Sequence, residues 1–231
     1  MMTLLETINL SRSFGGLRAV DEVNFTLEKG EVRAVIGPNG AGKTTFVSLV
    51  SGRLAPTSGR VKFEGEDVTA LPAFRRVQRG IAYTFQITSI YGTLTAAENV
   101  ALAAHRPGSR AGLDALARVG LADRAGQIAG TLAYGHQRLL EVAMGLALHP
   151  KLLILDEPTQ GLSDAEIENF ISLVREVARE ATVLLIEHNM PVVMALAHRI
   201  TVLERGRILA EGSPAEIHAT AAVQAAYLGS G

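Results

Sequence analysis

The stretch from residue 37 to residue 45 constrains this chain more than any other feature. It reads Gly37-Pro38-Asn39-Gly40-Ala41-Gly42-Lys43-Thr44-Thr45 and fills every fixed position of the pattern G-x-x-x-x-G-K-[ST]. Residues 32–36 before it are largely apolar and β-branched, and residues 45–54 after it carry apolar side chains at helical spacing. A strand, a loop and a helix in this order predict a site whose backbone N–H groups bind the phosphates of a nucleoside triphosphate.

The residue types in this loop have separate roles in such a site. Glycines let the backbone curl around the phosphates, and the start of the helix adds a fixed partial positive charge. We expect Lys43 to reach the β- and γ-phosphates, Thr44 to bind a magnesium ion, and Thr45 to contact the α-phosphate side. The alternative is a glycine-rich turn that only caps a helix, but the Lys-Thr pair and both flanks favour the nucleotide site.

A second apolar run ends in two carboxylates, Asp156 and Glu157. Open α/β sheets bind ligands at the carboxyl ends of their strands, so we expect both acids to lie near the phosphate loop. Asp156 would hold the magnesium ion, directly or through water, and Glu157 would polarise the attacking water. The alternative is a strand followed by an acidic helix cap.

The composition excludes several classes of protein. The chain has 231 residues, which is enough to bury a sizeable core, and it has no cysteine for disulfides, thiolate metal sites or a nucleophile. The absence of cysteine fits a reducing compartment, so we expect a cytoplasmic chain. With 22 basic and 23 acidic residues, its net charge of −1 gives no general attraction to nucleic acid or to anionic membranes. We find neither a signal-peptide pattern nor about 18 consecutive apolar residues, so we expect that the chain does not enter a membrane by itself.

The order of strand and helix patterns predicts an α/β protein with a mainly parallel core sheet. Predicted strands cover residues 4–10, 23–27, 32–36, a pair within 59–66, 152–155, 183–186, 200–203 and 207–209. Predicted helices cover residues 45–54, 96–104, 113–119, 135–148, 164–179, a segment from 191, and 214–228. The first strands form an antiparallel part, and the Ala- and Leu-rich middle of the chain forms a helical part.

We therefore expect a single domain made of two parts. Residues 1–87 and 150–231 would form the nucleotide-binding core with its antiparallel β subdomain, and residues of about 88–149 would form an α-helical subdomain.

The motifs, taken in order, resemble those of the ATP-binding cassette ATPases, which are the motor subunits of ABC transporters. The resemblance covers essentially the whole chain and implies the P-loop NTPase fold of that family, with ATP and Mg²⁺ as cofactors. It also assigns roles to three further residues. Gln86, in Tyr83-Thr84-Phe85-Gln86, matches the glutamine that contacts the metal and the attacking water; His188 matches the switch histidine at the γ-phosphate; and Phe14 fits the aromatic that stacks on adenine. Taken alone, Gln86 would be a loop residue, His188 a structural histidine, and Phe14 equally well a core residue.

The resemblance extends to two segments that act on the nucleotide of a partner subunit. Residues 132–138 match the signature segment, in which Ala133 and Gly135 lie at a helix N-terminus facing the partner's γ-phosphate, and Asp164 belongs to the D-loop over residues 161–164. The signature departs from its commoner form, because Ala133 and His136 stand where the family usually has Ser and Gln. One hydroxyl donor is therefore missing, and we predict weaker ATP-driven dimerisation than a serine version would show.

One phosphate loop and one signature in a single chain imply a dimer, in which each ATP lies between the two subunits. The partner would be a second copy or a second ABC ATPase subunit. Within the family, the chain is similar to the ATPases of branched-chain and hydrophobic amino acid importers. The segments that carry this similarity are Phe14-Gly15-Gly16-Leu17, Gly80-Ile81, Thr84-Phe85-Gln86, Ile186-Glu187-His188-Asn189-Met190 and Ala226-Tyr227-Leu228-Gly229.

This similarity implies integral membrane permease subunits as partners, an extracytoplasmic substrate-binding protein as an indirect partner, no nucleic acid, and a place at the cytoplasmic face of the inner membrane. Two alternatives stay open at this point. One is the ATPase of a lipopolysaccharide-type or other exporter, and the other is a soluble ABC ATPase that acts on ribosomes or DNA. The second generally needs paired cassettes or long coiled-coil insertions, which this chain does not have.

Overall fold

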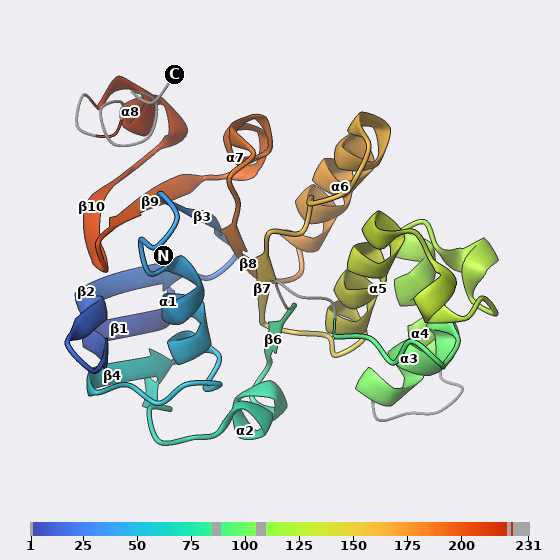
Figure 1. Cartoon of the computed structure of the whole chain (residues 1–231), viewed down its shortest axis with the longest axis horizontal. Helices are drawn as coiled ribbons and strands as arrows, with labels where there is room; N and C mark the ends of the chain where they lie inside the picture. The colour runs from blue at the N-terminus through green and yellow to red at the C-terminus, as the bar shows by residue number, and fades with distance from the viewer. Residues whose placement is uncertain (1, 85–88, 105–109, 221–222, 224–231) are drawn as a thin grey trace.

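The computed structural model describes residues 2–84, 89–104, 110–220 and 223. In this part of the chain, strands form two sheets (Figure 1). The antiparallel sheet, in the order β2-β1-β4-β5, contains β1 (Thr3–Phe14), β2 (Leu17–Glu28), β4 (Ser58–Phe63) and β5 (Glu66–Asp67). The core sheet, in the order β10-β9-β3-β8-β7-β6, contains β3 (Val32–Ile36), β6 (Ile81–Tyr83), β7 (Leu152–Asp156), β8 (Thr182–Ile186), β9 (Arg199–Glu204) and β10 (Arg207–Gly212).

The core sheet is parallel except at one edge, as the sequence predicts. Strands β6, β7, β8, β3 and β9 pair in parallel, and β10 alone pairs antiparallel to β9. The described helices are α1 (Lys43–Val50), α2 (Ala73–Gln78), α3 (Ala96–Ala103), α4 (Arg110–Arg118), α5 (Tyr134–Leu146), α6 (Asp164–Val177), α7 (Met190–Leu196) and α8 (Pro214–Ala219). None of them has the length and apolar composition needed to span a bilayer.

The core sheet separates two hydrophobic cores because neighbouring side chains on a strand point to opposite faces. On one face Leu152 and Leu184 pack with α1 and the antiparallel sheet, where the rings of Phe25 and Phe46 meet edge to face at 5.2 Å. On the other face residues such as Leu153 pack against α5 and α6. The helices α3, α4 and α5 gather beyond this second face, on the opposite side of the sheet from α1 (Figure 1).

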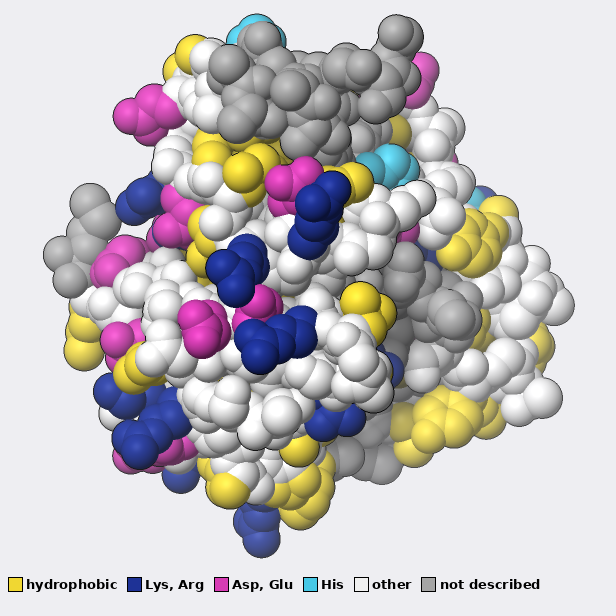
Figure 2. All heavy atoms as spheres, turned by 60° about the vertical axis from the view of Figure 1, so that its left-hand side comes forward, with side chains coloured by type: hydrophobic (Ala, Val, Ile, Leu, Met, Phe, Trp, Pro, Cys, Tyr) yellow, Lys and Arg dark blue, Asp and Glu magenta, His cyan; other side chains and the backbone are white. Residues whose placement is uncertain are grey.

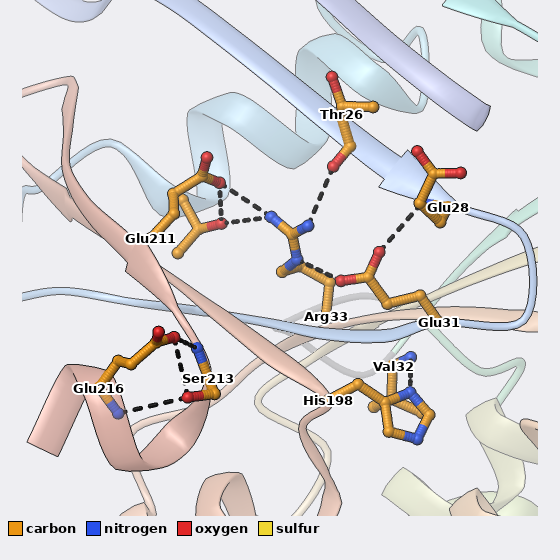
Figure 3. Close-up of polar contacts among 10 residues, drawn as sticks. Thr26, Glu28, Glu31, Val32, Arg33, His198, Glu211, Ser213 and Glu216 are labelled. Atoms are coloured by element: carbon orange, nitrogen blue, oxygen red, sulfur yellow. Dashed lines mark hydrogen bonds and ion pairs between the residues drawn. The ribbon is translucent and has the colours of Figure 1, made fainter. Parts of the chain in front are cut away.

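A buried ion-pair network joins the two sheets near the beginning of β3 (Figure 3). The Arg33 side chain, only 3% exposed, lies 2.6 Å from Glu31 and 2.8 Å from Glu211. It also donates to Oγ1 of Thr201 at 3.0 Å and to the carbonyl oxygen of Thr26 at 3.1 Å. One guanidinium therefore connects β2, β3, β9 and β10, at the end of β3 away from the phosphate loop.

Two elements have no counterpart in the predicted pattern, and several predicted elements end at other residues; the first two strands, predicted at 4–10 and 23–27, span Thr3–Phe14 and Leu17–Glu28. Helix α2 and strand β6 have no predicted counterpart. The helix after the phosphate loop ends at Val50 rather than at residue 54, because a turn follows at Ser51 and Gly52, where φ is +77°. The last helix spans Pro214–Ala219, and most of the predicted helix beyond it lies outside the described residues.

Candidate functional site

The phosphate loop joins β3 to α1, and its backbone requires glycine at two positions. Gly37 and Gly42 have φ values of +152° and +99°. A Cβ atom at Gly37 would lie 2.2 Å from the carbonyl oxygen of Leu203, and one at Gly42 would lie 2.2 Å from that of Ala19. The loop is thus pressed between β9 and β2. No side chain caps α1 at Gly42, so the N–H groups of the first helical turn are left for an anion.

The ammonium group of Lys43 is buried and binds the backbone of the phosphate loop itself. Lys43 is 9% exposed, and its Nζ donates to the carbonyl oxygens of Gly37 at 2.6 Å and Pro38 at 3.1 Å. Burial lowers the pKa of Lys43, while the nearby carboxylates of Glu157 and Asp156 act in the opposite direction. The cluster of Lys43 with these two acids is the arrangement that the sequence predicts.

The remaining loop residues differ in how far solvent, and therefore a ligand, can reach them. The exposed ones are Asn39, Gly40 and Thr44, the half-buried ones are Pro38, Gly42 and Thr45, and Ala41 is buried. The hydroxyl-bearing Thr44 thus faces outward at the start of α1, as a ligand of a phosphate-bound cation must.

Asp156 ends β7 fully buried, and its two carboxylate oxygens differ. The Tyr83 hydroxyl donates to Oδ2 at 2.7 Å, whereas Oδ1 has no hydrogen-bond partner among the described residues. Burial raises the pKa of Asp156, and it also raises that of Tyr83. A buried carboxylate oxygen without a partner is unfavourable, and oxygen ligands of this kind suit Mg²⁺. The residues present therefore fit the predicted metal.

Glu157 follows in a conformation that is rare for a residue with a Cβ atom. Its φ is +51°, in the left-handed region, and its N–H donates to the carbonyl oxygen of Ile186 at 2.9 Å. Such conformations cost about 1–3 kcal/mol and cluster at functional sites. The Glu157 carboxylate lies 3.9 Å from Nδ1 of His188, whose side chain is 60% exposed. The predicted base and the predicted switch histidine are thus neighbours.

Glu187 connects the two loops that carry Glu157 and His188, and this role was not predicted from the sequence. It is fully buried, and its Oε1 accepts hydrogen bonds from the N–H of Thr159 at 3.0 Å and from its hydroxyl at 2.5 Å. Its Oε2 accepts from the N–H of His188 at 3.0 Å and of Asn189 at 3.2 Å. The sequence does contain a pattern that could have revealed Glu187: it is a carboxylate directly after a continuous apolar strand, as Asp156 is.

The signature segment and the D-loop pack against each other within the chain. Ala133 is the N-cap of α5 and provides no side-chain cap. A Cβ atom at Gly135 would lie 2.7 Å from the carbonyl oxygen of Gly161, and one at Gly161 would lie 2.6 Å from the Tyr134 ring. Asp164 is exposed at the start of α6. These contacts join Gly135 to the D-loop and not to the phosphate loop of the same chain.

Two further predicted residues have different outcomes. Phe14 ends β1 with 46% of its surface exposed, and the Arg12 guanidinium lies 4.7 Å from its ring centroid. Core packing, the alternative interpretation of Phe14, is therefore wrong, and stacking on adenine stays a prediction. Gln86 lies outside the described residues.

An apolar groove of about 630 Å³ opens beside the site, between α2, β6 and α5. Phe74, 59% exposed, Val77 and Met144 contribute apolar wall, and Glu141 and Tyr83 contribute polar atoms. Tyr83 thus faces the groove while its hydroxyl holds Asp156.

Comparison with known proteins gives relatives along the whole chain. The family model described as ABC transporter matches residues 20–160. The high-affinity branched-chain amino acid transport ATP-binding protein BraF of Pseudomonas aeruginosa is 38% identical to this chain, in an alignment that covers 98% of this chain and 98% of BraF. The protein LivG of Escherichia coli K12, with the same description, is 36% identical over 98% of both chains.

Solved structures agree with the sequence relatives. The ADP conformation of MJ1267, an ATP-binding cassette of an ABC transporter, has a TM-score of 0.90 and 28% identity, covering 99% of this chain and 100% of that one. This similarity, together with the sheet order and the position of the loop, confirms the fold that the sequence predicts.

Proposed function

This chain belongs to the ABC transporter family, and from that membership we propose that it is the ATP-hydrolysing subunit that energises uptake of branched-chain or related amino acids through a membrane permease. The observation that carries the chemistry is the cluster of Lys43, Asp156 and Glu157 at the carboxyl end of the core sheet. The relatives described as branched-chain amino acid transport proteins carry the choice of substrate.

Different residues of the chain bind different parts of ATP and its magnesium ion. The N–H groups at the start of α1 and the Lys43 ammonium bind the phosphates, and Thr45 supports the α-phosphate side. Thr44, Asp156 and Gln86 would hold Mg²⁺, which supplies positive charge to the phosphate oxygens when it is bound. Tyr83 holds one oxygen of Asp156, and the other oxygen, which has no hydrogen-bond partner among the described residues, would be the one that serves the ion.

Hydrolysis requires a base beside the γ-phosphate. Glu157 orients the attacking water and accepts its proton, and the bond from its N–H to Ile186 holds its backbone in place. His188, next to Glu157, contacts the γ-phosphate, and Phe14 at the tip of the first hairpin stacks on the adenine.

The second half of each site comes from another subunit. Gly135 and Ala133 lie at the N-terminus of α5, where the helix dipole is positive and no side chain caps the helix. In a two-fold dimer this terminus, together with Asp164, faces the nucleotide of the partner, which is a second copy or a second ABC ATPase subunit. Closure on ATP and opening after hydrolysis convert chemical free energy into motion.

The groove beside α2 and α5 supports docking of a permease segment. It is lined mainly by apolar side chains, and the exposed Phe74 lies at its wall. We place the helical subdomain at about residues 88–149, where α3, α4 and α5 gather (Figure 1), and residues 1–87 and 150–231 in the nucleotide-binding core. Docking there would hold the chain at the cytoplasmic face of the inner membrane, with an extracytoplasmic substrate-binding protein as indirect partner.

The surface charges do not favour nucleic acid as a partner. On the face that Figure 2 shows, Lys and Arg side chains of the described residues are interspersed with Asp and Glu side chains. With a net charge of −1, the chain has no general attraction to a polyanion.

The variant Glu157→Gln tests the proposed mechanism. We expect the purified variant to bind ATP with unchanged affinity, because the phosphate loop is intact, and to lose the proton acceptor. Phosphate release should fall by roughly 100-fold or more, and the ATP-bound dimer should persist in size-exclusion chromatography. The exposed Glu168→Gln on α6 is the matched control. Rapid turnover by Glu157→Gln would contradict the role of Glu157.

The same pair of variants tests the transported substrate in cells. A host strain that lacks this chain should lose uptake of labelled leucine, and Glu168→Gln should restore it while Glu157→Gln should not. Undiminished leucine uptake in the deletion strain would reject the amino acid assignment and leave the ATPase chemistry standing.

A further inference from the structure

Arg138 connects the signature helix to the two acids at the end of β7. It lies on α5 one turn after Gly135 and is 2% exposed. Its Nη2 donates to the carbonyl oxygen of Asp156 at 2.5 Å and to that of Glu157 at 2.6 Å. The carbonyl groups of Asp156 and Glu157, which together form the catalytic turn, therefore both bind one guanidinium.

A buried carboxylate on the same helix holds this guanidinium. Nη1 of Arg138 lies 3.2 Å from Oε2 of Glu141, which is 4% exposed. The other oxygen of Glu141 accepts a hydrogen bond from the N–H of Ser89 at 2.5 Å. Glu141 and Ser89 both line the groove beside α2, so a continuous series of contacts runs from the groove to the catalytic turn.

The turn that Arg138 binds needs external support. Glu157 is held in the left-handed region, which is unfavourable for a residue with a side chain. Its N–H is fixed by Ile186, and its carbonyl oxygen converges with that of Asp156 on the same cation. Two carbonyl oxygens that converge on one point repel each other unless a donor lies between them, and Arg138 supplies that donor.

We propose that Arg138 is a positioning residue for hydrolysis: it fixes the backbone of Asp156 and Glu157, and thereby the direction of the Glu157 carboxylate, while Glu141 fixes Arg138. This inference rests on the proposed function, because it takes Glu157 as the base. The Arg138 side chain is buried against the carbonyl oxygens of Asp156 and Glu157. It acts through the peptide groups that carry the acids.

The variant Arg138→Lys separates this role from a general contribution to packing. Lysine keeps the charge, but its single ammonium group cannot keep the planar geometry that serves two carbonyls through one nitrogen and Glu141 through another. Arg33→Lys is the matched control, since Arg33 is equally buried and also pairs with carboxylates, at the opposite end of the sheet.

The full-length chain and its variants are compared by steady-state ATP hydrolysis and by direct ATP binding. For Arg138→Lys we expect kcat to fall by about 10- to 100-fold, the effect of a misplacement near 1 Å, with KM and ATP affinity unchanged. Hydrogen exchange in the peptide that contains Glu157 should become faster. Arg33→Lys should unfold at a lower temperature and keep the wild-type kcat and exchange.

The variant Glu141→Gln keeps the side-chain volume and removes the charge that holds Arg138, and we expect a smaller fall in kcat, again with KM unchanged. If Arg138→Lys does not fold, Glu141→Gln tests the inference in its place. A wild-type kcat in whichever of these variants folds would overturn the inference, as would an equal loss in Arg33→Lys. A wild-type chain that binds ATP but does not hydrolyse it, alone or mixed with its partner ATPase, would overturn the proposed function and this inference together.

Discussion

At the scale of single residues, Ala133 is one of the two positions, with His136, where the signature differs from its commoner form. As the N-cap of α5 it offers no hydroxyl, either to the helix or to a nucleotide beyond it. We predict that Ala133→Ser strengthens ATP-driven dimerisation, because a charge-assisted hydrogen bond contributes about 1.5–3 kcal/mol. The dimer dissociation constant should fall by roughly 10-fold or more in sedimentation experiments with ATP, in a Glu157→Gln background.

A serine at an N-cap also stabilises its own helix by about 0.5–2 kcal/mol. Thermal unfolding without nucleotide measures that effect separately, and Ala133→Asn, a good cap of different shape, is the control. If Ala133→Ser raised the unfolding temperature but left the dimer constant as it is in the wild type, the missing hydroxyl would have no role in the interface.

The residues that the sequence could predict are those in contiguous motifs. Lys43 and the pair Asp156 and Glu157 lie where the strand–loop pattern placed them. Tyr83 and Arg138 were quoted only as parts of motifs, because their importance comes from contacts with Asp156 and Glu157 far along the chain. Such contacts depend on strand order, and no local pattern encodes that order.

At the scale of elements, the N-terminus of α5 and the D-loop before α6 form one packed unit. We predict that Gly135→Ala moves them apart, because the new methyl group would lie 2.7 Å from the carbonyl oxygen of Gly161 and 2.9 Å from Leu162. ATP binding by the phosphate loop should persist, while ATP-driven dimerisation should weaken by roughly 10-fold, which corresponds to about 1.4 kcal/mol lost at the interface.

Gly126→Ala is the matched control, since a Cβ atom there meets nothing within 4 Å. Dimerisation of Gly135→Ala at the wild-type affinity would mean that this packing does not set the position of the signature helix.

Element prediction failed where elements were short. Strand β6 has three residues and α2 has six, which is too few for a period to show in the sequence. The longer α6 was predicted well, since the Ser163–Glu166 capping box marks its start and its apolar residues recur at helical spacing. The predicted division into core and helical subdomain remains a proposal.

At the scale of the whole molecule, the buried Arg33 guanidinium is one of the contacts that join the two sheets. We predict that Arg33→Met lowers the free energy of unfolding by about 3–5 kcal/mol, because it leaves Glu31 and Glu211 without their partner. Urea denaturation measures this. Arg79→Met breaks the exposed pair with Glu66 and should cost less than about 1 kcal/mol. Equal losses in the two variants would contradict a special role for the buried network.

The overall architecture could be predicted because alternating strands and helices with one phosphate loop admit few topologies. The order of the strands in the core sheet came only from the structure. Arg33 is the clearest omission: a charge within an otherwise apolar strand was passed over, although a buried arginine demands partners, and those partners join the two sheets.

The contact between Arg33 and Glu211 also bears on aggregation. In the described structure β10 lies at the edge of the core sheet, and an edge strand is where another chain could add by β-pairing. If β10 slipped by one residue, Glu211 would turn to the opposite face and Arg33 would lose one of its two carboxylate partners. The ion pair therefore penalises misregistered hairpins of β9 and β10, and so reduces the exposed, wrongly paired strands from which aggregates grow.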